Sequence, residues 1–566
     1  MKMVKSLILG STASLLALGG AQAADLPVKA KAVEYVKICS LYGAGFYYIP
    51  GTDTCIRIGG QIRLDVAFNG GIYDAPFWQG STGGANSYNR QYFGTRERVN
   101  LNTDTRTATE YGVLRTYANL QFDFTQGVSN IAGGAITEVD FAFIQFAGFT
   151  FGKSVSMFDP QWALAKPYIS SGFQAGSNNA TGIPQLAYTA SFGNGVSATI
   201  SLEDAYPYRT AGVVNASSGF IGPFSANTGG ANVINQLSPY VNNTFLGNNQ
   251  GGDHVPDIVG NIRLDQAWGT LHFGAAAHEV HGTWYPTAAV SSSSGNPGTA
   301  TSDMGHPGSA WGYAVTGAIE LKNLPTGAGD SLKVDSSFGH GAAKYVWGGT
   351  IDTTGAGRYA KVGGVGSGTC AGSSSPFGPS NTSACNGSIG FGYVLDGVYG
   401  GSGANGGSSA ASIQLSNSWE VNAFYEHYWN PQWRTSVFGS YSAMSYGASA
   451  NALLLNVANA TTPGQGFLGS TVIPASSGGS ISSGSFNGTD TGSFNFEIAQ
   501  VGTKTSWQPV KDLTLSAEFI YSRLYQHHTG LFTVAGSQIS GQSSAQTYTP
   551  GDQNFYNGAV QILRSF

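Results

Sequence analysis

A short histidine-containing segment has the residue types of a zinc site. His278, Glu279 and His281 have the residue types of a zinc-protease motif but lack one residue of the H-E-x-x-H spacing. The segment alternates like a β-strand, and residues three apart on a strand face opposite sides, so these two histidines cannot bind one ion together. The pair His527-His528 has no nearby carboxylate or thiol in the sequence and is interpreted as solvated. The sequence therefore predicts no metal site, no catalytic residue and no cofactor.

Five arginines at polar positions of alternating segments have the type needed to select solutes by charge. A ring of charge at the narrow point of a water-filled passage favours one sign of ion, because the low-dielectric wall focuses its field. Asp65, Asp104 and Asp123 lie on the same polar faces, so the alternative is that the arginines are ion-paired across strands. The candidate constriction residues are Arg57, Arg63, Arg96, Arg98 and Arg115.

The segments that carry these arginines alternate with period two. The stretch CIRIGGQIRLDVAF places Ile56 and Ile58 on one face and Arg57 on the other. The same alternation recurs along the chain, and Asn194-Gly195 between two alternating runs is a strong signal for a β-hairpin. The pattern predicts sixteen strands, at 56–67, 93–104, 110–124, 138–147, 149–155, 185–192, 196–204, 257–266, 270–280, 311–321, 331–341, 416–427, 433–443, 495–506, 512–523 and 554–566.

Short turns alternate with long loops between these strands. This asymmetry, with an even number of strands of about ten residues each, is typical of a transmembrane β-barrel. The predicted fold is therefore all-β, a 16-stranded antiparallel barrel with short periplasmic turns and long extracellular loops. Its lumen would be too wide for side chains to fill, so the apolar faces meet lipid and the polar faces line water. Four tryptophans beside short turns are expected in an interfacial girdle, namely Trp268, Trp429, Trp433 and Trp507.

The composition agrees with a membrane barrel. Charged residues make up 10% of the 566-residue chain, against roughly a quarter in ordinary soluble domains. Glycine contributes 82 residues and aromatic residues 12%, a mixture that favours strands and turns over packed helices. The net charge of -5 offers no basic footprint, so nucleic acid is not an expected partner.

The N-terminus has the features of an export signal. Lys2 and Lys5 precede an apolar stretch that closes with a small-residue cleavage site, so residues 1–23 are interpreted as a secretory signal peptide. Later segments lack about twenty uninterrupted apolar residues, which excludes a helical membrane protein. Residues 24–55 then form an N-terminal segment ahead of the barrel.

Four cysteines form two local pairs in a chain expected to reach an oxidising compartment. Cys39 with Cys55 and Cys370 with Cys385 are the candidate disulfides. Each bridge would close a loop of about fifteen residues, worth about 3 kcal/mol in the chain-entropy model. Local pairing is an inference from spacing, because four cysteines allow three connectivities.

Several long blocks of sequence extend from Cys39 towards the C-terminus. They include VKICSLYGAGFYYIPGTDTCIRIGGQIRLDV, FAFIQFAGFTFGKSVSMFD and FYEHYWNPQWRTSVFGSY, in order and with plausible strand spacing. These blocks resemble the alphaproteobacterial (rhizobial-type) general porin family. The resemblance implies a homotrimer in the outer membrane of a Gram-negative bacterium. In each copy the barrel, residues 56–566, would form a passive pore for small hydrophilic solutes and ions.

The resemblance also implies that the loop after the fifth strand, residues 156–184, folds into the lumen and narrows it. Asp159 and Lys166 are the only charged residues of this loop, which departs from the porin pattern of a strongly acidic loop facing a basic wall. Asp159 is the candidate constriction residue on the loop. We expect weak selectivity with a slight preference for anions.

The long loops also fit an alternative function. Loop 342–415, with its candidate disulfide, would suit a surface adhesin or receptor that uses the barrel as an anchor. The sequence offers no convincing Ser/His or Asp/His arrangement for a hydrolase, so an enzyme is not expected. The leading interpretation is an outer-membrane porin, whose partners are membrane lipids, other copies of the chain and diffusing solutes.

Overall fold

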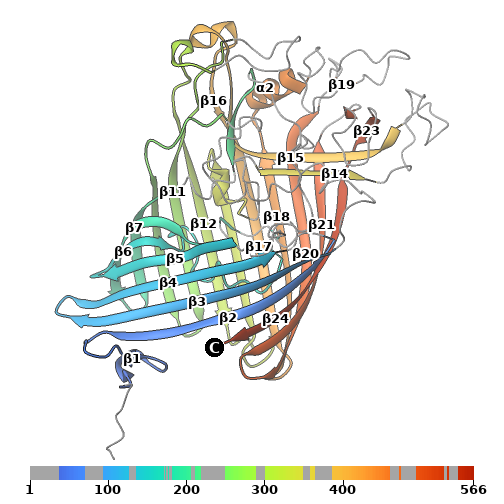
Figure 1. The fold of residues 1–566 in the computed structure, drawn as a ribbon. Coiled ribbons are helices and arrows are strands. Elements are labelled where there is room, and N and C mark those ends of the chain that lie inside the picture. The colour runs from blue at the N-terminus through green and yellow to red at the C-terminus, as the bar shows by residue number, and fades with distance from the viewer. Residues whose placement is uncertain are drawn as a thin grey trace, which may run out of the picture.

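The polypeptide forms a closed, tilted β-barrel (Figure 1). The structure is a computed structural model, and it describes residues 37–69, 93–125, 136–170, 173, 176–177, 181–204, 211–217, 249–287, 300–348, 357–363, 385–458, 471–472, 492–527, 532–534 and 546–566. The 16 barrel strands are β2 (Cys55–Phe68), β3 (Phe93–Thr109), β4 (Gly112–Thr125), β5 (Ile136–Phe146), β6 (Phe149–Ser154), β7 (Ile183–Gly193), β8 (Val196–Glu203), β10 (Asp257–Gln266), β11 (Gly269–Val280), β12 (Ala310–Lys322), β13 (Ser331–His340), β17 (Asn417–Tyr428), β18 (Trp433–Ser445), β20 (Ser493–Val510), β21 (Leu513–His527) and β24 (Gln553–Ser565).

Every strand pairs antiparallel with its neighbours around the ring. The barrel closes where β2 pairs with β24, with Val66 opposite Val560. Closure leaves no unpaired strand edge in hydrocarbon, where unsatisfied backbone groups are costly. The predicted all-β, 16-stranded antiparallel barrel is therefore confirmed.

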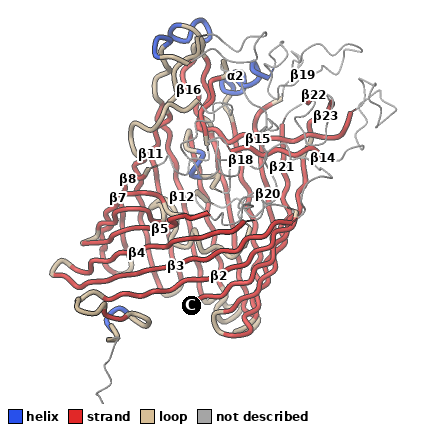
Figure 2. Tube along the Cα trace, in the orientation of Figure 1, coloured by secondary structure: helices blue, strands red, loops and turns tan. Residues whose placement is uncertain are grey.

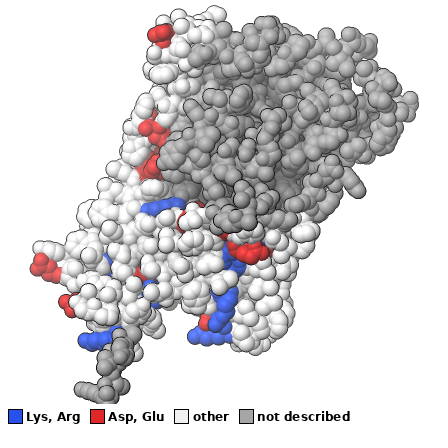
Figure 3. All heavy atoms as spheres, viewed as in Figure 1, with Lys and Arg blue, Asp and Glu red and all other residues white. Residues whose placement is uncertain are grey.

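The two faces of the barrel differ as the period-two pattern requires. Side chains on the outer face, such as Ile62 at 55%, Ile262 at 61% and Phe273 at 63%, are exposed and apolar. Most of the described surface in Figure 3 carries neither Lys or Arg nor Asp or Glu, which suits contact with lipid. The four tryptophans beside the short turns are also exposed, and Trp433 stacks on Trp507 from the adjacent strand at 5.6 Å between ring centroids.

The short turns use residues that tolerate a left-handed backbone. Asn194 and Gly195, which join β7 to β8, have φ angles of 51° and 77°. Two successive positive φ angles are the mark of a type I′ turn, whose twist matches that of the flanking strands. The Asn-Gly pair therefore predicted this hairpin, and the turn has the geometry that these two residue types favour.

The predicted long loop 342–415 contains strands that the sequence pattern did not indicate. Its described residues include β14 (Gly357–Gly363), β15 (Cys385–Gly400) and β16 (Ala411–Leu415), and β15 crosses over the long-loop end of the barrel (Figure 2). Four side chains of β15 are fully buried, namely those of Val394, Leu395, Val398 and Tyr399. Their burial stabilises the strand, although its many glycines have a low strand propensity and so gave no strand signal in the sequence. The same small sheet includes β9 (Gly212–Asn215), β19 (Thr471–Val472), β22 (Phe532–Val534) and β23 (Gln546–Pro550), while α2 (Ala448–Ala458) lies in another long loop.

The N-terminal segment lies at the short-turn end of the barrel. Strand β1 (Tyr47–Tyr48) pairs with the start of β2, and the predicted disulfide between Cys39 and Cys55 is present. Cys370 and the predicted signal peptide, residues 1–23, lie outside the described residues, as does the side chain of Cys385. Among the described residues, no helix has the length and apolar character needed to cross a membrane.

Candidate pore lining

The chain between β6 and β7 runs along the inner wall of the barrel. Asn261, which points inward from β10, donates a hydrogen bond to the carbonyl oxygen of Met157 at 2.6 Å. The ring Nε2 of His272 on β11 lies 2.8 Å from the carbonyl oxygen of Phe158. The described part of the predicted loop 156–184 therefore contacts side chains that face the lumen.

Aromatic packing attaches the middle of this loop to the wall. Trp162 and Phe173 pack against Phe424, Phe438 and Ile520, which point inward from β17, β18 and β21. The ring centroids of Phe173 and Phe438 lie 5.0 Å apart in a T-shaped contact, and Phe173 is fully buried. Apolar side chains at lumen-facing positions are thus explained, because the loop covers them.

Three buried glutamates of the wall bind backbone N–H groups of the loop. Glu203 accepts hydrogen bonds from the N–H of Met157 at 2.8 Å and the hydroxyl of Ser156 at 2.6 Å. Glu518 accepts from the N–H groups of Ile169 and Ser170, and Glu420 accepts from that of Gly176 at 2.9 Å. A buried carboxylate needs such donors, because burying a charge without partners is costly. The sequence analysis missed these residues; their signal is a carboxylate on the lumen-facing side of a strand.

The two charged residues of the loop are buried against the same wall. Asp159 is 7% exposed and accepts a hydrogen bond from the Ser177 hydroxyl at 2.6 Å. Lys166 is 8% exposed and lies 3.7 Å from Asp335 of β13. Burial raises the pKa of Asp159 to about 7, although Ser177 and Lys166 oppose the shift. The candidate constriction residue Asp159 is therefore largely covered by protein.

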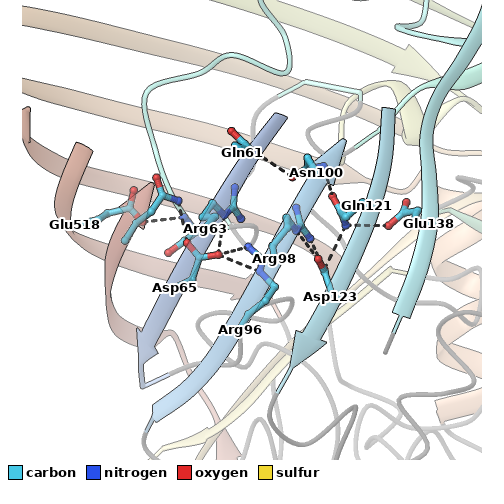
Figure 4. Close-up of polar contacts among 12 residues, drawn as sticks. Gln61, Arg63, Asp65, Arg96, Arg98, Asn100, Gln121, Asp123, Glu138 and Glu518 are labelled. Atoms are coloured by element: carbon cyan, nitrogen blue, oxygen red, sulfur yellow. Dashed lines mark hydrogen bonds and ion pairs between the residues drawn. The ribbon is translucent and has the colours of Figure 1, made fainter. Parts of the chain in front are cut away.

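The arginines line the inner face of β2, β3 and β4. Asp65 is the centre of the first group, and it lies 2.8 Å from Arg63 and 2.7 Å from Arg96 (Figure 4). It also accepts a hydrogen bond from Gln561. The Arg96 side chain is 5% exposed, whereas that of Arg63 is 19% exposed. Arg63 is therefore the member of this pair that presents more of its surface to the lumen.

Arg98 extends the first group across β3. It lies directly opposite Arg63 in the register of the two strands, and it is held by Asp123 of β4 at 2.6 Å. Like charges opposite each other are destabilising unless they are compensated, and Asp65 and Asp123 supply that compensation. Gln121 continues the polar band, donating to both Asp123 and Glu138 (Figure 4).

A second group of arginines lies nearer the short-turn end. Arg115 and Arg106 contact Asp104 at 3.0 and 2.9 Å, and Arg57 is 3.8 Å from the same carboxylate. Phe46 of the N-terminal segment packs against the guanidinium groups of Arg57 and Arg106, at 5.1 and 4.9 Å from the ring centroid. The disulfide-bonded segment thus lies against this arginine group.

The structure therefore distributes the five predicted arginines over two groups, the first with Asp65 and Asp123 and the second with Asp104. The pairing with Asp65, Asp104 and Asp123, which the sequence left open, is the observed arrangement. Arg106 belongs to the second group and was missed, although it lies on the same alternating face as Arg96 and Arg98.

A second segment enters the lumen after β13. Tyr345 packs on Phe158 at 4.5 Å between ring centroids and donates a hydrogen bond to Asp257 at 2.6 Å. Lys344 lies 2.8 Å from the same carboxylate, and His278 contacts it from β11 at 2.6 Å. This segment supports the start of the inserted loop from the long-loop side.

A closed barrel with an apolar exterior, a polar inner wall and an inserted loop defines an outer-membrane channel-type β-barrel. The comparisons agree: a family model described as a porin subfamily matches residues 25–559. The chain belongs to this porin subfamily, and it spans the outer membrane of a Gram-negative bacterium several times.

The relatives are alphaproteobacterial porins. Porin Omp2a of Brucella ovis is 37% identical over 299 residues, which cover 50% of this chain and 72% of that protein. Porin Omp2a of Brucella canis is 32% identical over 294 residues, 49% of this chain and 66% of that protein. The outer membrane channel DcaP of Acinetobacter baumannii is 12% identical with a TM-score of 0.49, over 92% of this chain and 99% of that one. The porin relatives favour a channel over the surface adhesin, and over an enzyme.

Proposed function

We propose that this protein is a passive diffusion channel for small hydrophilic solutes and ions. Its narrow passage lies between the arginine-bearing wall of β2–β4 and the loop inserted after β6. The observation that carries the proposal is the attachment of this loop to inward-facing side chains across the lumen, from Glu203 on β8 to Glu518 on β21. A loop held at both of these strands narrows the lumen and leaves a passage beside the wall of β2–β4.

The charge of this passage supports weak selectivity for anions. In the first group, Arg63, Arg96 and Arg98 face two carboxylates, Asp65 and Asp123, which leaves an excess of one positive charge. Glu138, which joins the same hydrogen-bonded band, offsets that excess. The first group is therefore close to neutral.

The second group is more basic than the first. Arg57, Arg106 and Arg115 share the single carboxylate Asp104, an excess of two positive charges. The side chains of these arginines are 49%, 27% and 29% exposed, so their charge reaches the aqueous phase. We infer that anions enter more readily than cations and that the preference comes chiefly from the short-turn mouth.

The proposal is tested by single-channel recording of the unheated, full-length protein in planar bilayers. Ohmic conductance steps and a reversal potential of the sign for anions across a KCl gradient are the expected results. Silence from folded protein would show that the lumen is occluded and would overturn the proposal.

We further propose that three copies assemble, as the family resemblance implies. Unheated samples should then migrate as a trimer on a denaturing gel, and boiled samples as a monomer. Conductance steps should arrive in groups of three. Monomer alone in unheated samples of folded protein would contradict the assembly.

A further inference from the structure

A cluster of three potential metal ligands lies at the long-loop end of β11. Ligand atoms of His254, Glu279 and His281 all lie within 4.8 Å of one another. The ring centroids of His254 and His281 are 4.0 Å apart. His278, which faces away from His281 in the strand pattern, contacts Asp257 instead. The histidine that joins Glu279 and His281 in the cluster is His254, which lies in the segment before β10.

Backbone pairing brings this second segment beside β11. The N–H of Gly251 donates to the carbonyl oxygen of His281 at 3.0 Å, and Thr283 donates in the same way to Asn249 at 2.7 Å. A side chain at position 251 would meet the His281 ring at 2.6 Å, so glycine is what allows the close approach. The pairing therefore places His254, three residues later, next to His281.

Hydrogen bonds orient the ligands as in known metal sites. Nδ1 of His281 lies 2.9 Å from the Ser309 hydroxyl, which leaves Nε2 of the same ring for a metal ion. Glu279 is 9% exposed, and one of its carboxylate oxygens accepts a hydrogen bond from the backbone N–H of His254 at 3.3 Å. A third imidazole, His306, lies with its centroid 6.1 Å from that of His281.

We propose that His254, Glu279 and His281 bind a divalent transition-metal ion of the Zn²⁺ type at the outer rim of the barrel. Two imidazoles and a carboxylate form the ligand set of open zinc sites, in which water takes the fourth position. Ca²⁺ and Mg²⁺ prefer sites made of oxygen atoms, so the two imidazoles select against them. Donor atoms around a tetrahedral Zn²⁺ lie roughly 3.3 Å apart, so binding requires the three donor atoms, which lie within 4.8 Å of one another, to move closer together.

The site has a structural consequence beyond diffusion. Exposed Trp311 lies opposite Glu279 in the strand register, which puts the cluster at the level of the outer aromatic residues. A bound ion would cross-link the segment that enters β10 to the end of β11.

The test is Zn²⁺ binding to the full-length, folded protein by equilibrium dialysis, with ZnCl₂ and CaCl₂ as separate probes. We expect one saturable Zn²⁺ ion per chain and much weaker Ca²⁺ binding. His254→Ala and His281→Ala should each lower Zn²⁺ affinity by at least about tenfold, since even partners of ligands contribute about 10- to 100-fold. Ser309→Ala should lower it by about tenfold for the same reason.

A matched control is available at another part of the rim. His527 forms an imidazole–carboxylate pair with Glu497 at 2.9 Å, and the two residue types are those of the proposed site. His527→Ala should leave Zn²⁺ binding unchanged, and heat-modifiable gel migration verifies that each variant is folded. Unchanged Zn²⁺ affinity in a folded His254→Ala/His281→Ala variant would overturn the proposal, as would tighter binding of Ca²⁺ than of Zn²⁺.

Discussion

The inner wall of the barrel has two parts that use the same alternating pattern in different ways. On β2–β4, arginines and aspartates pair with each other and keep part of their surface in the lumen, as Arg63 and Arg98 do at 19% and 14% exposure. On β8, β17 and β21, the lumen-facing carboxylates Glu203, Glu420 and Glu518 are buried beneath the inserted loop. We call the first part, on β2–β4, the exposed wall and the second part, on β8, β17 and β21, the covered wall. The exposed wall carries accessible charge, and the covered wall holds the loop.

The comparison shows that what lies opposite a carboxylate decides its role. Asp65 and Asp123 have arginine side chains as partners, so each charge is compensated by another charge on the wall. Glu518 instead binds backbone N–H groups of the loop, so it is compensated by fixed dipoles and ties two segments together. One wall therefore sets the field in the passage, and the other sets its width.

The largest effect is expected from loosening the covered wall. Phe173→Ala removes a fully buried ring, a change that costs about 3–5 kcal/mol in a packed site. Because 1.4 kcal/mol is a tenfold change in an equilibrium, this loss is enough to release the loop in many molecules. Single-channel conductance should rise and become noisier.

The control for this variant is Phe519→Ala. Phe519 precedes Ile520 on β21 but points outward and is 51% exposed, so its loss leaves the contacts of the loop intact. Equal conductance changes in the two variants would show that the effect of Phe173→Ala does not come from loss of the contacts between the loop and the wall.

The next effect should come from the exposed wall and concern selectivity. The double variant Arg63→Gln/Arg98→Gln removes two partly exposed charges and leaves Asp65 and Asp123 without these partners. Salt of about 0.1 M screens charges beyond roughly 10 Å, so we expect the anion-to-cation permeability ratio to fall by about twofold. Reversal potentials across a KCl gradient measure this ratio.

Arg523→Gln makes the same chemical change outside the passage. Arg523 pairs with Asp552 at 2.9 Å near the end of β21, on the outward-facing side of that strand. Its reversal potential should equal that of the unaltered protein. A double variant with an unchanged ratio would remove Arg63 and Arg98 from the selectivity of the channel and leave the arginines around Asp104 as its source.

The barrel was predictable because each strand has lipid on one side and a polar lumen on the other. Ile56, Arg57 and Ile58 show this alternation, and β2 has the predicted position to within one residue at each end. The predicted strand 93–104 is shorter than β3, which continues to Thr109 with polar residues that lack the apolar alternation.

The covered wall was not predictable in the same way. Phe424 and Phe438 break the polar inner face, but nothing local shows that a loop from the other side of the barrel covers them. The same reasoning applies to His254 and His281, whose contact depends on backbone pairing of two segments. The five arginines lie on the inner face of β2, β3 and β4, and their division into two groups depends on cross-strand register.

A smaller effect of pH on loop attachment follows from Asp159. Burial raises the pKa of this carboxyl from 3.8 to about 7. Between these two pH values Asp159 keeps its proton while the loop is attached to the wall and loses it when the loop is released. Attachment should therefore be strongest below about pH 4 and weaken as the pH rises to about 7. Channel noise compared at pH 5 and pH 8 measures the effect.

Asp159→Asn should remove the part of this dependence that Asp159 contributes, because the amide does not titrate and keeps an oxygen that can accept from Ser177. The control is Asp265→Asn, since the Asp265 side chain is 43% exposed and pairs with Arg263 beside a short turn. Persistence of the full pH dependence in Asp159→Asn would assign it to groups elsewhere, such as the exposed wall.

The smallest effect on the channel is expected from the disulfide. In the double variant Cys39→Ser/Cys55→Ser the N-terminal segment loses about 3 kcal/mol of chain-entropy stabilisation. Because Phe46 of this segment packs on Arg57 and Arg106 at the short-turn mouth, loosening it alters the more basic arginine group without touching the loop. Proteolysis of the segment should become faster while conductance stays the same and the permeability ratio moves slightly. A conductance change as large as that of Phe173→Ala would mean that the N-terminal segment, rather than the loop, sets the width of the passage.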